Sequence, residues 1–131
     1  MIFIDASALV AALAPEPDAT AINGKIVERR AVTSPIALWE TARALARING
    51  TSLEAASRHI AAYLETAGVT VVPIGQADSV EAMRAQDRFG KGQHPAALNM
   101  GDCFAYACAR THGAALLFKG EDFAQTDIEA A

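Results

Sequence analysis

Cysteine is scarce in this sequence, whose 131 residues contain two, Cys103 and Cys108. Their spacing of five fits neither a CxxC redox pair nor half of a zinc site, so we expect two free, buried thiols in a reducing cytosol. Long apolar runs are also missing, since no stretch approaches the 18 or more residues of a membrane span. The apolar segment near the N-terminus is short and no basic residue precedes it, which indicates no export signal. We therefore expect a cytoplasmic protein.

Basic residues are outnumbered by acidic ones. Eleven Lys and Arg stand against 15 Asp and Glu, a formal net charge of -4. This balance argues against a basic surface that grips nucleic acid by charge alone, so a bound polyanion would need cations from elsewhere. The length suits one compact domain over residues 1–131, with a core that needs no metal or disulfide crosslink.

Alanine-rich stretches alternate with short β-branched runs along the chain, which predicts helices alternating with strands. Strands are expected at residues 1–5, 31–33, 69–74 and 115–118, and helices at residues 7–14, 18–30, 35–49, 51–67, 77–89 and 99–111. The run at 69–74 lacks polar alternation, which predicts a strand buried on both faces. The pattern as a whole predicts the α/β class, as a three-layer α/β/α domain with a central, mainly parallel sheet.

Capping residues support several of these boundaries. Ser34 followed by Pro35 is typical of a helix start. Thr51 and Glu54 have the spacing of a capping box, and Asp18 is placed to cap the second helix. The predicted starts of three helices therefore depend on these side chains.

Four acidic residues lie at the ends of elements expected to point toward one edge of the sheet. In open α/β sheets, ligands bind beyond the carboxyl ends of the strands, where the strand order reverses. Asp5 comes directly after the first strand, and Asp122 follows the fourth by a short turn, so the two face one crevice if those strands are neighbours. Glu40 lies one and a half turns into its helix among apolar neighbours, and Asp102 lies in the first turn of a largely apolar helix.

Each of these acids also has a purely structural interpretation. Asp5 could cap the helix that begins near residue 7, and Asp102 could complement a helix dipole. Glu40 could pair with Arg43 on its own helix, and Asp122 could be an ordinary turn residue. The four together are a stronger indication than any one alone, because without them eleven acids balance eleven bases.

Clustered carboxylates repel one another and raise their pKa values unless cations hold them. Oxygen ligands without His or Cys select a hard divalent ion, Mg²⁺ or Mn²⁺, which also binds phosphate oxygens. Such an ion polarises a phosphoryl group and lowers the pKa of a bound water. The four acids therefore predict metal-dependent hydrolysis of phosphodiesters.

The other reactive residue types form no comparable pattern. The three histidines are scattered without metal-ligand spacing, and there is no GxGxxG or Walker motif. No serine has the surroundings of a catalytic nucleophile. Trp39, Tyr63 and Phe104 have helical spacing with aliphatic residues, which predicts core positions.

Four segments carry a resemblance to a known family. They are MIFIDASAL at residues 1–9, SPIALWE at 34–40, LNMGDCFAYA at 98–107 and LLFKGEDF at 116–123. In this order, over almost the whole chain, they resemble the PIN-domain family, and among its branches the VapC toxins of bacterial toxin-antitoxin pairs. The resemblance implies a PIN-like α/β/α fold and an endoribonuclease that depends on Mg²⁺ or Mn²⁺.

By motif position, the resemblance assigns catalytic, metal-ligand roles to Asp5, Glu40, Asp102 and Asp122. It implies that water attacks the phosphodiester and leaves 5′-phosphate and 3′-hydroxyl ends.

Three further positions match the family's pattern less directly. Ser7 and Asn99 match polar positions that border the family's site, where they either support the ligands or serve as helix caps. Glu121 stands where the family often has Asn or Asp, so Glu121 and Asp122 compete for the place of the fourth acid, and we favour Asp122.

The resemblance also implies partners. They are an RNA substrate such as a tRNA or rRNA loop, a second copy in a homodimer, and a small VapB-like antitoxin that often places an arginine in the acidic pocket. A groove among the alanine- and leucine-rich helices near the N-terminus could receive an amphipathic antitoxin helix.

Two other function classes compete with the ribonuclease. The alternative is a non-catalytic binding module that acts mainly in an antitoxin complex repressing transcription. A receiver-type phosphotransfer domain is disfavoured, because no aspartate ends the predicted strand at 69–74.

Overall fold

The computed structural model describes all 131 residues, and a four-stranded sheet lies at its centre. The strands are β1 (Ile2–Ile4), β2 (Ala31–Thr33), β3 (Thr70–Val71) and β4 (Ala115–Leu117). Their order is β3-β2-β1-β4 and every pair is parallel. The prediction that the first and fourth strands are neighbours is therefore confirmed, and the strand order reverses at β1.

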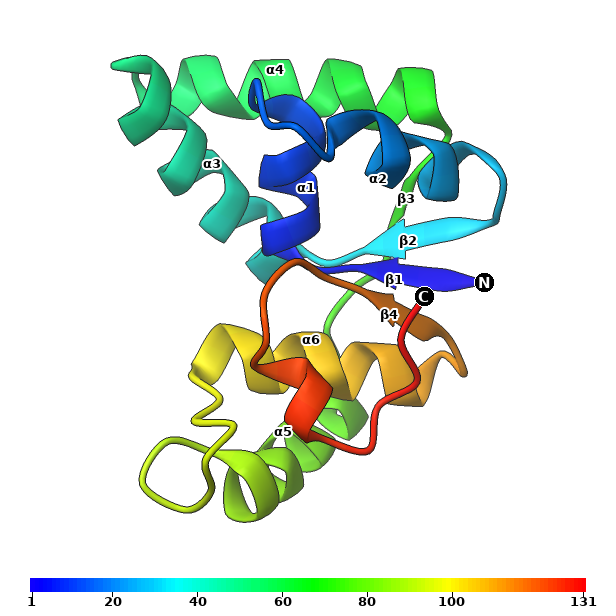
Figure 1. The fold of residues 1–131 in the computed structure, drawn as a ribbon, viewed down its shortest axis with the longest axis vertical. Coiled ribbons are helices and arrows are strands. Elements are labelled where there is room, and N and C mark those ends of the chain that lie inside the picture. The colour runs from blue at the N-terminus through cyan, green and yellow to red at the C-terminus, as the bar shows by residue number, and fades with distance from the viewer.

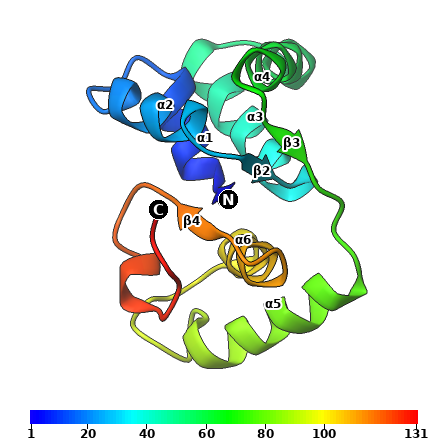
Figure 2. The same ribbon diagram turned by 90° about the vertical axis from the view of Figure 1, so that its right-hand side faces the viewer.

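Helices cover both faces of this sheet. They are α1 (Ala6–Leu13), α2 (Ala19–Val27), α3 (Pro35–Asn49), α4 (Leu53–Ala67), α5 (Gln76–Phe89) and α6 (Met100–Thr111), with a 3₁₀ turn η1 (Phe123–Gln125). Helices α1 to α4 lie on one side of the strands, and α5 and α6 lie on the other (Figure 1). Figure 2 shows the same division after a quarter turn. The predicted three-layer α/β/α architecture is confirmed.

The central strand β1 contributes to the core on both of its faces. Ile2 and Ile4 belong to the apolar cluster on the side of α1 to α4, and Phe3 belongs to the cluster with α5 and α6. All three are fully buried. Because successive side chains of a strand point to opposite faces, this short run joins the two clusters and fixes the position of the residue after it.

The third strand differs from its prediction. Strand β3 has two residues, Thr70 and Val71, and both are exposed. It pairs with β2 alone and forms the edge of the sheet. Val72 and Ile74 leave the strand and pack against the cluster of α5 and α6. The predicted strand at 69–74, buried on both faces, is therefore wrong, because the apolar run bends away from the sheet.

The helix caps are confirmed at α3 and wrong at α4. Ser34 accepts a hydrogen bond of 3.2 Å from the backbone N–H of Ala37, and Pro35 follows it as predicted. At α4 the capping residue is Ser52, and Glu54 contacts an arginine one turn later. The predicted capping box from Thr51 does not form, since a cap one residue later also satisfies the first free N–H groups.

Both cysteines are free and buried in α6, as predicted. Burial raises the pKa of Cys103 to about 11 and that of Cys108 to about 12, so both remain thiols at neutral pH. None of the helices has the length and apolar character needed to span a bilayer.

Candidate active site

Asp5 lies where β1 ends and α1 begins. Its carboxylate caps α1, since Oδ2 accepts the N–H of Ser7 at 3.0 Å and the hydroxyl of Ser7 at 2.5 Å. The backbone N–H of Asp5 donates to Leu117 of β4 at 3.0 Å. Asp5 is thus held at the point where the strand order reverses, and the structural interpretation of Asp5 as a helix cap is confirmed.

The electrostatics of Asp5 show a carboxylate that lacks compensation. The side chain is 5% exposed, and this burial raises the pKa of Asp5. The Ser7 hydrogen bonds lower the pKa in part, and the negative charge of Asp122 raises it again. Both Ser7 bonds end on Oδ2, and the carboxylate takes part in no ion pair of the chain.

Glu40 points from α3 toward the start of α6. A Cβ placed on Gly101 would lie 2.2 Å from Oε2 of Glu40, so the carboxylate fills the space that any side chain at position 101 would need. Partial burial raises the pKa of Glu40 to about 7, and the charges of Asp5 and Asp102 add to this rise.

Sequence reasoning missed Gly101, although a weak signal was available. Glycine is a poor residue for the first turn of an apolar helix, and such a position often marks a close approach.

Asp102 lies in the first turn of α6, where it forms a reciprocal cap with Asn99. The side chain of Asn99 accepts the N–H of Asp102 at 2.9 Å, and Oδ2 of Asp102 accepts the N–H of Asn99 at 3.1 Å. Burial raises the pKa of Asp102 to about 6; the Asn99 bond opposes this rise, and the charges of Asp5 and Asp122 add to it. Asn99 is therefore a helix cap that also orients Asp102.

Asp122 is exposed at the start of η1, and the next residue, Phe123, is buried and anchors that turn. The charge of Asp122 raises the pKa values of both Asp5 and Asp102. Glu121 raises none of the three carboxyl pKa values in this region. The local electrostatics thus favour Asp122 over Glu121 as the fourth acid.

These mutual effects join all four acids in one negative patch beyond the carboxyl ends of β1 and β4. None of the four takes part in an ion pair within the chain. The alternative pairing of Glu40 with Arg43 is wrong, since the Arg43 guanidinium lies 4.9 Å from the ring centre of Trp39. The patch therefore has no cation of its own.

Lys119 comes close to this patch but its charge is used elsewhere. Its backbone N–H donates to the Ser7 hydroxyl at 3.0 Å, while its ammonium contacts Glu16 and Asp18. This ion pair also explains why Asp18, although it precedes α2, makes no capping hydrogen bond there. The expected Asp18 cap is absent, because the Asp18 carboxylate forms an ion pair with Lys119 instead.

The residues suit a hard divalent cation in chemistry but do not form a closed set of ligands. No group of three or more His, Cys, Asp or Glu side chains is arranged to hold a metal ion as the side chains stand. Carboxylates that repel one another are expected to stay apart until a cation draws them together. The oxygen-only donors, the raised pKa values and the missing counter-charge all fit such an ion.

An apolar groove is lined in part by residues at the start of α6. It has a volume of about 330 Å³ and lies between α5 and α6, where Met83, Met100 and Phe104 are among its lining residues. A groove was expected among the helices near the N-terminus. The structure instead has this one on the opposite side of the sheet.

Comparison with known proteins gives consistent results. Residues 2–129 match the PIN domain family. The chain is 43% identical over 129 residues to a protein of Mycolicibacterium smegmatis named ribonuclease VapC, and the alignment covers 97% of each chain.

Two solved structures have the same fold. One is Mycobacterium tuberculosis VapC20, described as a toxin that cleaves the sarcin-ricin loop, with a TM-score of 0.78, 20% identity, and coverage of 100% of this chain and 98% of that one. The other is a toxin-antitoxin complex from Klebsiella pneumoniae, with a TM-score of 0.71, 15% identity, and coverage of 97% and 93%.

Proposed function

This chain belongs to the PIN-domain family, and on that premise we propose that it is a VapC-type endoribonuclease, the toxin of a type II toxin-antitoxin pair. It hydrolyses RNA phosphodiester bonds with the help of Mg²⁺ or Mn²⁺ and thereby inhibits translation. The observation that carries the proposal is the patch of four carboxylates that repel one another where the strand order reverses.

Asp5, Glu40, Asp102 and Asp122 would hold the ion. When bound, it supplies a positive field for the phosphoryl oxygens and lowers the pKa of a water molecule. Ser7 and Asn99 fix the carboxylates of Asp5 and Asp102 through one oxygen each. Glu40, whose pKa lies at about 7, carries its carboxyl proton part of the time at neutral pH, so cation uptake releases protons.

Replacement of Asp5 tests the proposal. Asp5→Asn removes the charge, but asparagine is also a good helix cap, so α1 should still form. We expect RNA cleavage to fall by about 100-fold or more, because a transition-state contact in a preorganised site has this magnitude. The measurement is Mn²⁺-dependent cleavage of total RNA, with 5′-phosphate ends mapped.

The matched control is Asp87→Asn, which removes one exposed acid of α5 that lies outside the patch and forms no ion pair. It should cleave at the wild-type rate. An Asp5→Asn protein that is folded and still cleaves at that rate would contradict the proposal. If the wild-type protein instead shows no cleavage with either ion, the non-catalytic module is favoured.

The partners follow from the same premise. We propose an RNA substrate of the tRNA or rRNA class, a homodimer, and a VapB-like antitoxin whose arginine would compensate the acidic patch. The groove between α5 and α6 is apolar and is lined by Met100 and Cys103, which flank Asp102 in the chain, and this suits an antitoxin helix that ends at the patch. A cytoplasmic location fits this substrate.

A further inference from the structure

Trp39 does not lie in the core, contrary to the expectation from its helical spacing. It is 55% exposed on α3, directly before Glu40 in the chain. It is also the single tryptophan of the protein. A large aromatic side chain that stays exposed beside an acidic patch is available to a ligand.

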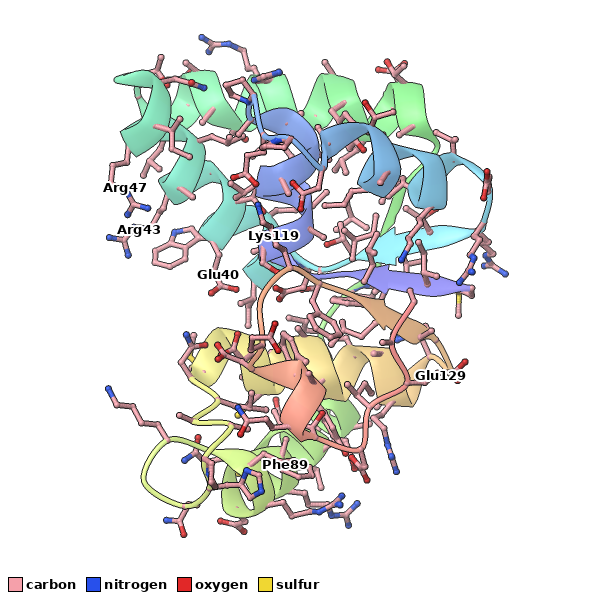
Figure 3. All side chains as sticks on the ribbon, in the orientation of Figure 1. Glu40, Arg43, Arg47, Phe89, Lys119 and Glu129 are labelled. Atoms are coloured by element: carbon pink, nitrogen blue, oxygen red, sulfur yellow. The ribbon has the colours of Figure 1, made fainter.

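Two arginines extend from Trp39 along the same side of α3. Arg43 stacks its guanidinium over the indole, 4.9 Å from the ring centre, and Arg47 follows one turn later. Residues four apart share a helix face, with a rise of about 6 Å between them. Glu40, Arg43 and Arg47 project from the same side of α3, with Glu40 at the end nearer α6 (Figure 3).

Neither arginine has an acidic partner. Both are exposed, and the seven ion pairs of the chain involve other basic residues. In a protein with a net charge of -4, two neighbouring unpaired guanidinium groups form a local excess of positive charge beside the acidic patch. They are suited to anionic groups that approach the acidic patch from this side.

We propose that Trp39, Arg43 and Arg47 form a stacking strip that binds unpaired nucleotides of the RNA substrate beside the acidic patch. This inference rests on the proposed ribonuclease function. An indole stacks on any nucleobase, and arginines bind the flanking phosphates. A base within a duplex is already stacked and paired, so the strip selects single-stranded segments such as loops.

A second copy of the chain fits the strip less well. It would bury two guanidinium groups that have no acidic partner within the chain, and unpaired buried charges are costly. RNA brings one phosphate for each nucleotide and needs no such compensation.

The fluorescence of Trp39 gives a direct test. We would titrate the Asp5→Asn protein, in which RNA stays intact, with a 12-nucleotide oligoadenylate and with a 12-base-pair RNA duplex. Stacking should quench the fluorescence with the single strand, and the duplex should quench it far less. Because binding is read without cleavage, failure of the strip and failure of the ribonuclease proposal are distinguishable.

Variants in the same background separate the two contributions, with binding followed by the anisotropy of a labelled oligoadenylate. Trp39→Ala should weaken binding about tenfold, and Trp39→Phe should retain most of it. The logarithm of the binding constant falls linearly with the logarithm of the salt concentration. The double variant Arg43→Ala, Arg47→Ala should make this slope less steep by about 1.4, at about 0.7 for each lost phosphate contact. The double variant Arg29→Ala, Arg30→Ala removes the same charge from exposed residues before β2, at the opposite edge of the sheet, and should leave the slope unchanged.

Three results would overturn the inference. They are an unquenched Trp39 at saturating oligoadenylate, equal salt slopes for the two double variants, and a Trp39→Ala protein that binds the oligonucleotide normally but changes from dimer to monomer in analytical ultracentrifugation. The last result would identify the strip as an interface between copies of the chain.

Discussion

Gly101 shows how one missing side chain determines the position of a catalytic candidate. The Gly101→Ala variant places a methyl group where the Glu40 carboxylate now lies, and that flexible carboxylate must move. Alanine is the better helix former by about 0.5–1 kcal/mol, so stability should stay level or rise. We expect RNA cleavage to drop about tenfold or more without loss of folded protein, as measured by cleavage rate and thermal unfolding together.

Gly24→Ala is the matched control for this substitution. Gly24 also lies inside a helix, and a Cβ there would meet nothing within 4 Å. The control should gain about the same stability and keep its full activity. If Gly101→Ala cleaves RNA as fast as Gly24→Ala, the position of Glu40 does not depend on the glycine.

Individual residues differ in how far the sequence reveals their roles. Asp5 and Asp122 were predictable because strand ends in parallel sheets converge at one edge, whatever the details of packing. The exposure of Trp39 was not, since spacing shows which residues share a helix face but not whether another element covers that face. The contact of Glu40 with Gly101 depends on how closely α3 approaches α6, which neither helix encodes alone.

At the scale of elements, α4 allows a test of which residue starts the helix. Ser52 accepts the N–H of Ala55 at 3.1 Å, whereas Thr51 makes no capping contact. Ser52→Ala should therefore lower the free energy of unfolding by about 1 kcal/mol, and Thr51→Ala should change it by much less. Chemical denaturation of both variants measures the difference. Equal losses, or a larger loss for Thr51→Ala, would show that the helix starts elsewhere.

Elements with local start and stop residues were predicted well, and elements defined by their neighbours were not. The limits of α3 follow from Ser34 and Pro35 at its start and Gly50 at its end, where φ is 63°. Strand β2 has the predicted limits. Strand β3 was overestimated because an apolar run can pack as a strand or as an irregular segment over α5, and the choice depends on where the sheet ends.

At the scale of the whole molecule, the basic residues that form ion pairs all pair with acids other than the four of the candidate site. Five of the eleven basic residues are tied to acids in surface ion pairs, while the four acids of the patch have no cationic partner. Surface pairs add little to stability, whereas an uncompensated buried carboxylate costs stability when it ionises. The protein therefore tolerates, at its site, a negative charge that no group of the chain offsets.

This cost predicts how the metal-free protein responds to pH. Glu40 and Asp102 have ordinary pKa values near 4.5 and 3.8, and folding raises them to about 7 and about 6. Between those limits the folded protein binds more protons than the unfolded chain, so stability falls as pH rises from about 4.5 to 7. Asp127, whose pKa is lowered by Tyr106 and Arg88, acts in the opposite direction, but below its ordinary value of 3.8 and thus outside this window.

Thermal unfolding with a chelator from pH 4.5 to 8 should show this fall, and Glu40→Gln should reduce it. Manganese should reverse it, because a ligand that binds the folded state alone stabilises by about 2.7 kcal/mol at a hundred times its Kd. The stabilisation should be largest above pH 7, where the carboxylates are ionised and accept the cation, and should vanish near pH 4.5, where protons occupy them. A melting temperature that rises from pH 5 to 7 in the chelator, or that manganese leaves unchanged at pH 7.5, would show that the four acids do not act as one cation-dependent unit.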